Sequence, residues 1–235
     1  GFMIYQGGNW PKEYHGSAFT VNLHGHRLNR DTIERKGATY VAHHAPDFMK
    51  IADPWFRGVE LLQHPDGSVY IADWTDVGEC HENDGVHRTS GRIYRVECGK
   101  PLHFPHGLEE MALPKLVRLA CDAEEPVSRM ARRVIQSYDT SQHPAVLKAE
   151  ITHLGKVIGS NASEKEQLRA IWVLNALLGD SVKVAIREQD LSNHSSQHEH
   201  VRAWVVRLLI DRQDLEPGTI DALVSLAQRD TSGLV

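Results

Sequence analysis

The stretch VELLQHPDGSVYIADW, residues 59–74, contains two short apolar runs that are separated by a turn. The runs Val59–Leu62 and Val69–Asp73 are rich in β-branched and apolar residues, which favour strands. Between them, Pro65 presets its own φ angle and Gly67 accepts a positive one, which is typical of a β-turn. The stretch therefore predicts a β-hairpin, the unit from which the blades of a β-propeller are built.

Similar strand patterns lie on both sides of this hairpin. Residues 19–23 alternate apolar and polar side chains, Tyr40-Val41 resumes the pattern after Gly37, and GRIYRVE at residues 91–97 alternates again. Residues 1–102 are therefore predicted to be the C-terminal blades of a β-propeller. A propeller needs at least about four blades and these residues supply about two, so we expect the chain to be a fragment of a longer protein.

The hydrophobic period changes near residue 103, where apolar residues begin to recur every three to four positions, as on a helix. PVSRMARRVIQSY starts with Pro126 in a first helical turn. SEKEQLRAIWVLNALLG offers Ser163 and Glu166 as a capping box and ends at Gly179. EHVRAWVVRLLIDR and TIDALVSLAQR repeat the pattern, so antiparallel helices joined by short loops are predicted.

Weak internal repetition accompanies these helices. Leu168-Arg169-Ala170 and Val201-Arg202-Ala203 align at an offset of 33 residues. Helix pairs that recur at about this spacing are typical of α-solenoids such as HEAT repeats. The predicted architecture is therefore an α+β chain in two parts, a partial six-bladed β-propeller over residues 1–102 and a HEAT-like α-solenoid over residues 103–235.

Composition narrows the range of partners. The formal net charge is −5 and the charges are well mixed, so nucleic acid is not an expected partner. No apolar run approaches the roughly 20 residues that cross a bilayer, and the first residues do not have the pattern of a signal peptide. The three cysteines form no C-x-x-C pair and no haem-attachment motif, so no covalent haem is expected, although one disulfide, such as Cys80–Cys98, remains open.

A polar segment, WTDVGECHENDGVHRTSGRIYRV at residues 74–96, is the strongest candidate site. Its carboxylates and imidazoles suit calcium if the oxygens dominate, or zinc or iron if the histidines engage. The spacing matches no standard metal motif, so a loop in which polar side chains only cap turns is the alternative. The predicted metal ligands are Asp76, Glu79, His81, Asp84 and His87.

Two histidines in NLHGHRLN, His24 and His26, are placed two residues apart on a strand or at its exit. Because side chains alternate along a strand, both would point in the same direction. Such a pair could bind a metal or act as a base, or it could simply be solvated.

The segments GFMIYQGGNWPKEYHGSAFTVNLHGHRLNR, ADPWFRGVELLQHPDGSVYIADWTDVGECHENDGVHRTSGRIYRV, LRAIWVLNALLG and HVRAWVVRLLIDR resemble the membrane-bound dehydrogenase family of planctomycete-like bacteria. The resemblance implies a sorbosone- or glucose-dehydrogenase-type six-bladed propeller that is followed by HEAT repeats and often by a cytochrome-c domain. It implies a periplasmic or secreted location, and partners that include the rest of the propeller and a cytochrome-c domain or another protein on the solenoid.

The resemblance also implies a chemistry. Pyrroloquinoline quinone and calcium are the cofactors expected in the full-length protein, with no oxidoreductase activity in the fragment alone. A histidine would take the hydroxyl proton of a sugar or alcohol, and arginines would bind the carboxylates of the cofactor. The implied catalytic residues are His24, Arg57 and His81, and the implied cofactor ligands are Arg57 and Arg92.

Two alternatives stay open beside these roles. Arg57 could instead form a structural ion pair with Asp53 or Asp73. The whole chain could be a non-catalytic module, in which the propeller binds a glycan or a protein and the solenoid is a scaffold.

Overall fold

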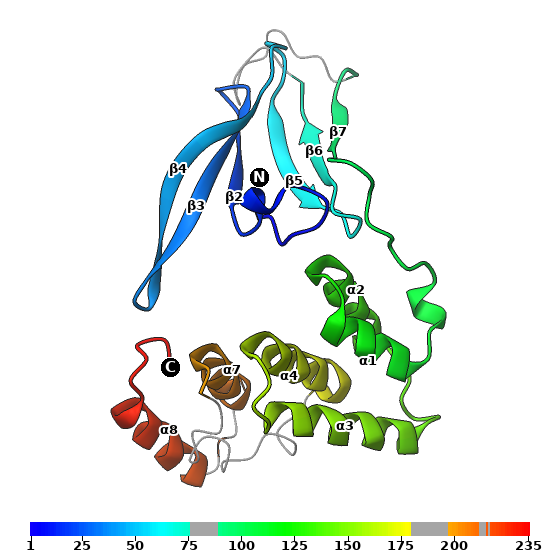
Figure 1. Ribbon diagram of the computed structural model, residues 1–235, viewed down its shortest axis with the longest axis vertical. Coiled ribbons are helices and arrows are strands. Elements are labelled where there is room, and N and C mark those ends of the chain that lie inside the picture. Colours follow the sequence, from blue (N-terminus) through cyan, green and yellow to red (C-terminus); the bar gives the residue numbers. More distant parts are fainter. Residues whose placement is uncertain (76–88, 180–196, 212–214, 216) are drawn as a thin grey trace. The chain divides into compact units, whose positions relative to one another are not determined.

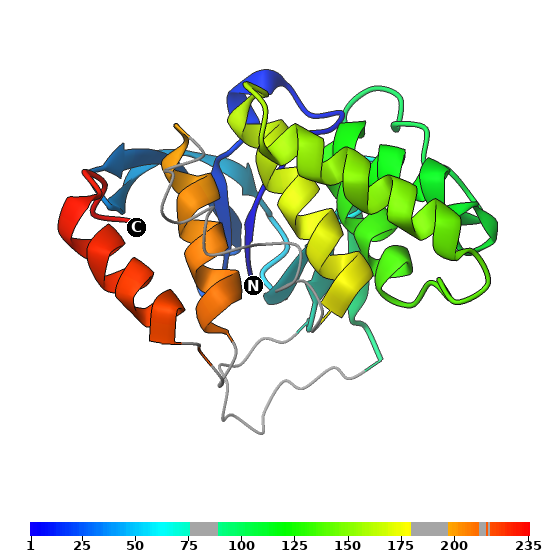
Figure 2. The same cartoon turned by 90° about the horizontal axis from the view of Figure 1, so that it is seen from below.

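The computed structural model describes residues 1–75, 89–179, 197–211, 215 and 217–235. It divides into two compact units, one of Gly1–Phe104 with Glu124–Pro126 and one of Pro105–Ala123 with Val127–Val235. The first unit contains the β-strands and the second consists mainly of α-helices (Figures 1 and 2). The predicted α+β chain in two parts is confirmed at this level.

Two antiparallel sheets form the first unit. The four-stranded sheet has the order β1-β2-β3-β4, with β1 at Phe2–Ile4, β2 at Ala18–Asn22, β3 at Arg27–Lys36 and β4 at Thr39–Lys50. A 3-10 turn, η1 at Lys12–Tyr14, lies between β1 and β2. The three-stranded sheet has the order β5-β6-β7, with β5 at Gly58–Gln63, β6 at Val69–Asp73 and β7 at Arg92–Val96.

The hairpin predicted from residues 59–74 is β5–β6. The Gly67 amide donates to the carbonyl oxygen of His64 at 2.9 Å. Gly67 has a φ of 88°, a positive value that glycine adopts without strain. The prediction of this turn is confirmed.

Strand β3 was not predicted. It is ten residues long and mostly polar, because beyond Asp31 it pairs only with β4, which leaves both faces of this two-stranded ribbon largely exposed. A strand that covers no core has no reason to alternate apolar and polar residues, so the pattern gave no signal.

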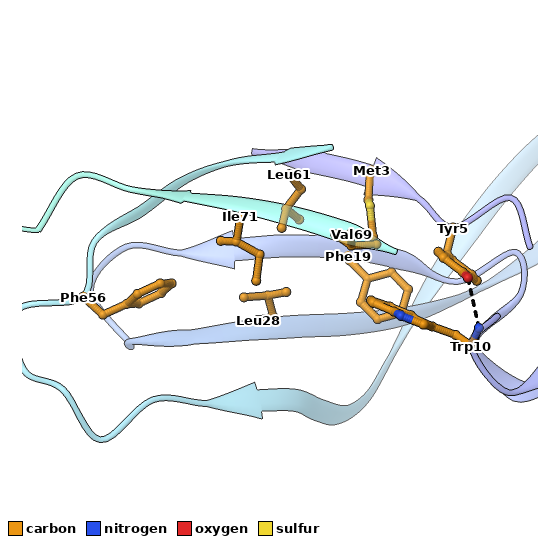
Figure 3. Close-up of a cluster of buried hydrophobic side chains, with 9 residues drawn as sticks. All are labelled: Met3, Tyr5, Trp10, Phe19, Leu28, Phe56, Leu61, Val69 and Ile71. Atoms are coloured by element: carbon orange, nitrogen blue, oxygen red, sulfur yellow. Dashed lines mark hydrogen bonds between the residues drawn. The ribbon is translucent and has the colours of Figure 1, made fainter. Parts of the chain in front are cut away.

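The inner faces of the two sheets share one hydrophobic core. Phe19 and Leu28 from the four-stranded sheet are fully buried together with Val69 and Ile71 from the three-stranded sheet (Figure 3). Tyr5 closes one end of this core, where its hydroxyl accepts from the Trp10 amide at 3.1 Å and donates to the Gly67 carbonyl. Trp10 is also buried in this core.

In the second unit, a 3-10 turn, η2 at Leu108–Glu110, precedes the α-helices. The described helices are α1 at Leu113–Asp122, α2 at Glu125–Gln136, α3 at Pro144–Ile158, α4 at Glu164–Leu178, α7 at Glu199–Ile210 and α8 at Pro217–Arg229. Helices α1 and α4, α3 and α4, and α4 and α7 contact each other. The capping box of Ser163 and Glu166 is formed as predicted, and α4 has Gly179 at its C-cap.

The two arginines of the internal repeat each bind the end of another helix. Arg169 is buried in α4 and donates from Nη1 to the carbonyl oxygens of Cys121 at 2.8 Å and Ala123 at 2.7 Å, at the C-terminus of α1. Arg202 in α7 binds the Asp230 carboxylate with two hydrogen bonds of 2.7 and 2.9 Å. The contacts of Arg169 satisfy carbonyl groups that the end of α1 leaves without an intrahelical partner, and the contact of Arg202 joins α7 to the residue that follows α8.

Among the described residues, no helix combines the length and the apolar character needed to cross a membrane.

Candidate functional site

Charged side chains of the first unit gather where the β2–β3 turn meets the ends of the three-stranded sheet. His26 lies in the turn, Asp53 lies between β4 and β5, and Arg57 immediately precedes β5. The register pairs Gly58 with Asp73 and Asp73 with Arg92, so the end of β6 and the start of β7 meet at the same place. Strand pairing therefore brings together residues that lie far apart in the sequence.

Backbone carbonyl groups hold the side chain of Arg57. Its Nη1 donates to the oxygen of Pro54 at 2.9 Å and to that of Phe56 at 3.0 Å, and it lies 3.0 Å from Nδ1 of His26. The residue is only 8% exposed. The guanidinium group is therefore fixed in a single position.

Nδ1 of His26 lies close to both the Arg57 guanidinium and a backbone carbonyl group. Nη1 of Arg57 has two hydrogens, and the two carbonyl groups take both. Nδ1 of His26 also lies 2.9 Å from the Phe56 oxygen, and this contact is a hydrogen bond in the tautomer that carries the proton on Nδ1. In the neutral ring Nε2 is then the acceptor, and it forms no hydrogen bond within the described residues.

A buried carboxylate anchors the same region. Oδ1 of Asp73 accepts from the backbone amides of Arg57 and Thr75, each at 2.9 Å, and Oδ2 accepts from the Thr75 hydroxyl at 2.8 Å. The side chain of Asp73 is completely buried. Three donors therefore satisfy the charged oxygens of Asp73. The carboxylate holds the backbone just before β5, at Arg57, and just after β6, at Thr75.

Arg92 and Asp53 form the accessible polar part of the group. Nη1 of Arg92 donates to Asp53 Oδ2 at 2.8 Å and to the Tyr94 hydroxyl at 3.1 Å. Hydrogen bonds from the Trp55 amide and from Arg92 hold the pKa of Asp53 below its ordinary value, so this carboxylate stays ionised. The side chain of Arg92 is 47% exposed, which leaves part of the guanidinium accessible.

Two residues at this site have left-handed backbone conformations. The φ angles are 48° at His26 and 54° at Thr75, and these are the only residues other than glycine with positive φ in the described part of the chain. Such a conformation is strained, above all for a β-branched residue such as threonine. Strain of this kind is concentrated at functional sites.

The predicted site residues are distributed as follows. His24 is exposed in the turn that also contains His26, and both lie in the turn between β2 and β3, where strand alternation does not apply. Arg57 and Arg92 are brought together with His26. The ion pair with Asp53 is formed by Arg92.

Sequence reasoning weighed His26 only as a partner of His24. No local signal distinguished the two, because the contact that sets His26 apart comes from Phe56, 30 residues away.

The predicted metal ligands Asp76, Glu79, His81, Asp84 and His87 lie outside the described residues, and so does Cys80. Cys98 carries a free, exposed thiol. Within the described ranges, no three His, Cys, Asp or Glu side chains form a group that could hold a metal ion. Trp74, which follows β6, is 63% exposed.

Arg57 and Arg92 are not arranged to bind the carboxylates of a quinone cofactor, the role that the resemblance implies for them. Nη1 of Arg57 uses both of its hydrogens on protein carbonyl groups, and the side chain is buried, so it does not present a free fork to a carboxylate. Arg92 is accessible but already pairs with Asp53.

The second unit has a cavity of about 370 Å³ between α1 and α3. Its lining includes Arg118, Cys121, Glu150 and His153. Burial raises the pKa of Cys121 to about 11, so the group is a neutral thiol at physiological pH. A neutral thiol is a weak nucleophile, and the cavity is therefore not built for cysteine chemistry.

One comparison with known families gives a match. A family model described as Domain of unknown function (DUF7133) matches residues 1–100, which cover both sheets of the first unit. No curated protein and no solved structure matches the chain.

Proposed function

We propose that the first unit belongs to the β-propeller of a periplasmic or secreted sugar or alcohol dehydrogenase-like protein, and that it supplies a proton acceptor and polar binding groups to the substrate site. The helical unit, interpreted as a HEAT-like solenoid, is the interaction scaffold. The resemblance of the sequence motivates this proposal, and the geometry around His26 carries it.

The observation that carries the proposal is the contact of 2.9 Å between His26 Nδ1 and the Phe56 carbonyl oxygen. When Nδ1 donates a hydrogen bond to the Phe56 carbonyl, the lone pair of Nε2 is available to accept a proton from a substrate hydroxyl group. The Asp53 carboxylate is close enough to interact electrostatically with His26.

The oxidation of an alcohol removes a hydroxyl proton and a hydride. The hydride needs a redox cofactor as its acceptor, which other parts of the complete protein would bind. The role of Arg57 is to position His26, since its own Nη1 is committed to the backbone. Arg92 and Asp53 offer a donor and an acceptor side by side, which is suited to the hydroxyl groups of a sugar.

Exposed apolar side chains support the propeller interpretation. On the outer face of the three-stranded sheet, Leu62 is 64% exposed and Ile93 is 76% exposed. Apolar side chains on an open sheet face mark a contact with another layer. We assign this face to the next blade of the propeller.

The test is a dye-coupled oxidation assay on the complete protein, reconstituted with pyrroloquinoline quinone and calcium, over a panel of sugars and alcohols. His26→Gln is expected to lower kcat by about a hundred-fold or more, because it removes the proton acceptor. His43→Gln, on the exposed β3–β4 ribbon, is the matched control and should leave kcat unchanged.

His24→Gln decides between the two histidines of the turn. If His24→Gln loses activity and His26→Gln keeps it, His24 and not His26 is the proton acceptor. A complete protein that binds the cofactor but oxidises no member of the panel would overturn the dehydrogenase proposal.

A non-catalytic glycan-binding module is the second candidate. The observation in its favour is that Arg57 is held by the protein itself, which leaves the Arg92–Asp53 pair as an accessible binding group. In this case calorimetric titration with the same sugars should show saturable binding that Arg92→Gln weakens, with no turnover.

A further inference from the structure

The cavity of about 370 Å³ in the second unit lies between α1 and α3, two helices that contact each other (Figure 1). On α1, the lining residues recur at intervals of three and four positions, so they share one face of the helix. On α3, Glu150 and His153 are three positions apart and share a face for the same reason. These two faces line one space, which we call the α1–α3 cavity.

The charged groups of the α1–α3 cavity do not neutralise one another. Arg118 and Asp122 are four positions apart on α1, a spacing at which opposite charges commonly pair. Within the described residues, neither of them forms a hydrogen bond or an ion pair, and the same holds for Glu150 and His153. Charges of both signs that have no partner in the protein therefore line the same cavity.

The rest of the lining is apolar. It consists of Pro114, Val117 and Cys121 of α1, and Val117 is buried. Burial raises the pKa of Cys121 to about 11, so the thiol carries no charge at neutral pH. An uncharged thiol packs like a small apolar side chain. The cavity therefore has an apolar wall beside charged groups of both signs.

We propose that the α1–α3 cavity binds a small zwitterion with an apolar side chain, of the class of a free α-amino acid such as leucine. Arg118 donates to the carboxylate of the ligand, and Asp122 and Glu150 accept from its ammonium group. The side chain of the ligand packs against the apolar wall. The proposal goes beyond the proposed function, because it gives the helical unit a ligand of its own.

A ligand with a single charge fits this lining less well. A cation leaves the Arg118 guanidinium without a counter-charge, and an anion lies beside two carboxylates that repel it. A zwitterion satisfies the groups of both signs at once. The volume favours a small ligand, since 370 Å³ is close to the lower end of the roughly 300–1,000 Å³ that is usual for small-molecule sites.

Isothermal titration calorimetry with the full chain and L-leucine tests the proposal. Two analogues are the controls for charge: isoamylamine lacks the carboxylate, and 4-methylpentanoate lacks the ammonium group. We expect saturable binding of leucine, weakened by salt, and no comparable binding of either analogue. L-Serine has both charges but no apolar side chain, so it should bind more weakly than leucine.

Variants of the lining identify the groups that bind the ligand. Arg118→Gln should lower the affinity for leucine by roughly ten-fold or more, because a charge-assisted contact is lost. Asp122→Asn combined with Glu150→Gln should lower it to a similar extent. Arg133→Gln is the matched control, since this exposed arginine of α2 is not part of the lining, and it should leave the affinity unchanged. Circular dichroism verifies that each variant keeps its helices.

Nuclear magnetic resonance locates the binding site independently of the variants. Leucine should shift the amide signals of α1 and α3 and leave those of the β-strands in place. The proposal is overturned by the absence of saturable leucine binding, by equally tight binding of L-serine or of either analogue, by an equal loss with Arg133→Gln, or by shifts that avoid α1 and α3. None of these measurements uses a sugar or a redox cofactor, so their result is independent of the dehydrogenase proposal.

Discussion

At the scale of single residues, Gly58 sets how closely the two sheets of the first unit approach each other. A Cβ atom at this position would lie 2.2 Å from Cγ1 of Val21 in β2 and 2.7 Å from Cζ of Phe56. Both distances are shorter than any real contact. Glycine is therefore required at this point of the core by packing.

Gly58→Ala is expected to destabilise the protein by about 1–3 kcal/mol, because the added methyl group forces β2 or the Phe56 ring to move. Urea unfolding followed by tryptophan fluorescence measures the change. Gly155→Ala in α3 is the matched control, since its Cβ would meet open space and alanine favours a helix more than glycine does. An unchanged stability of the Gly58 variant would contradict the packing argument.

Some of the site residues could be predicted from the sequence and others could not. Arg57 and Arg92 could be singled out from the sequence, because the family resemblance implies arginines that bind a cofactor. The importance of His26 could not, because it depends on the carbonyl of Phe56 and on two hydrogens of Arg57. Such a relation exists only once β5 is placed next to the β2–β3 turn.

At the scale of elements, the turn between β5 and β6 depends on Asp66. Its Oδ1 accepts from the Ser68 amide at 2.9 Å and from the Ser68 hydroxyl, and its Oδ2 accepts from Arg95 of β7 at 2.9 Å. Burial raises the pKa of Asp66, but hydrogen bonds from Ser68 and His64 outweigh it, and the resulting pKa lies below the ordinary value. Asp66 thus holds the turn together and ties it to β7.

The lowered pKa of Asp66 predicts a pH dependence of stability. A carboxylate with a pKa lower in the folded than in the unfolded state stabilises the fold above its unfolded pKa, and this contribution is lost as the pH falls through the folded value. Asp66→Asn should therefore lower the free energy of unfolding at neutral pH, and the difference from the natural protein should shrink on acidification. Glu109→Gln, in η2, is the control, and a difference independent of pH would contradict the assignment.

At the scale of the whole molecule, each unit has its own buried core. The first is the core between the two sheets around Phe19 and Ile71, and the second lies among the helices around Leu116, Leu154 and Ile171. The buried Arg169 belongs to the second, where it binds the carbonyl groups at the end of α1. A substitution in one core should therefore lower the local stability of its own unit first.

Hydrogen exchange can test this expectation. Gly58→Ala should lower the protection of amides in β2, β5 and β6, and Arg169→Met should lower it in α1 and α4 by leaving two carbonyl groups without their donor. Loss of protection in the strands of the Arg169 variant, equal to that in its helices, would show that the two cores unfold as one.

The sequence by itself determined the division into a β part and a helical part, the β5–β6 hairpin and the capping box of α4. Each follows from local rules: the period of apolar residues, the backbone preference of Pro65 and Gly67, and the hydrogen bonds between Ser163 and Glu166. Tertiary structure alone decided that β3 is a long strand, that His26 is the histidine beside Arg57, and that Trp172 of α4 meets Trp204 of α7. The reason is physical: a strand without a core face leaves no apolar period, and contacts between residues 30 or more positions apart depend on how elements pack.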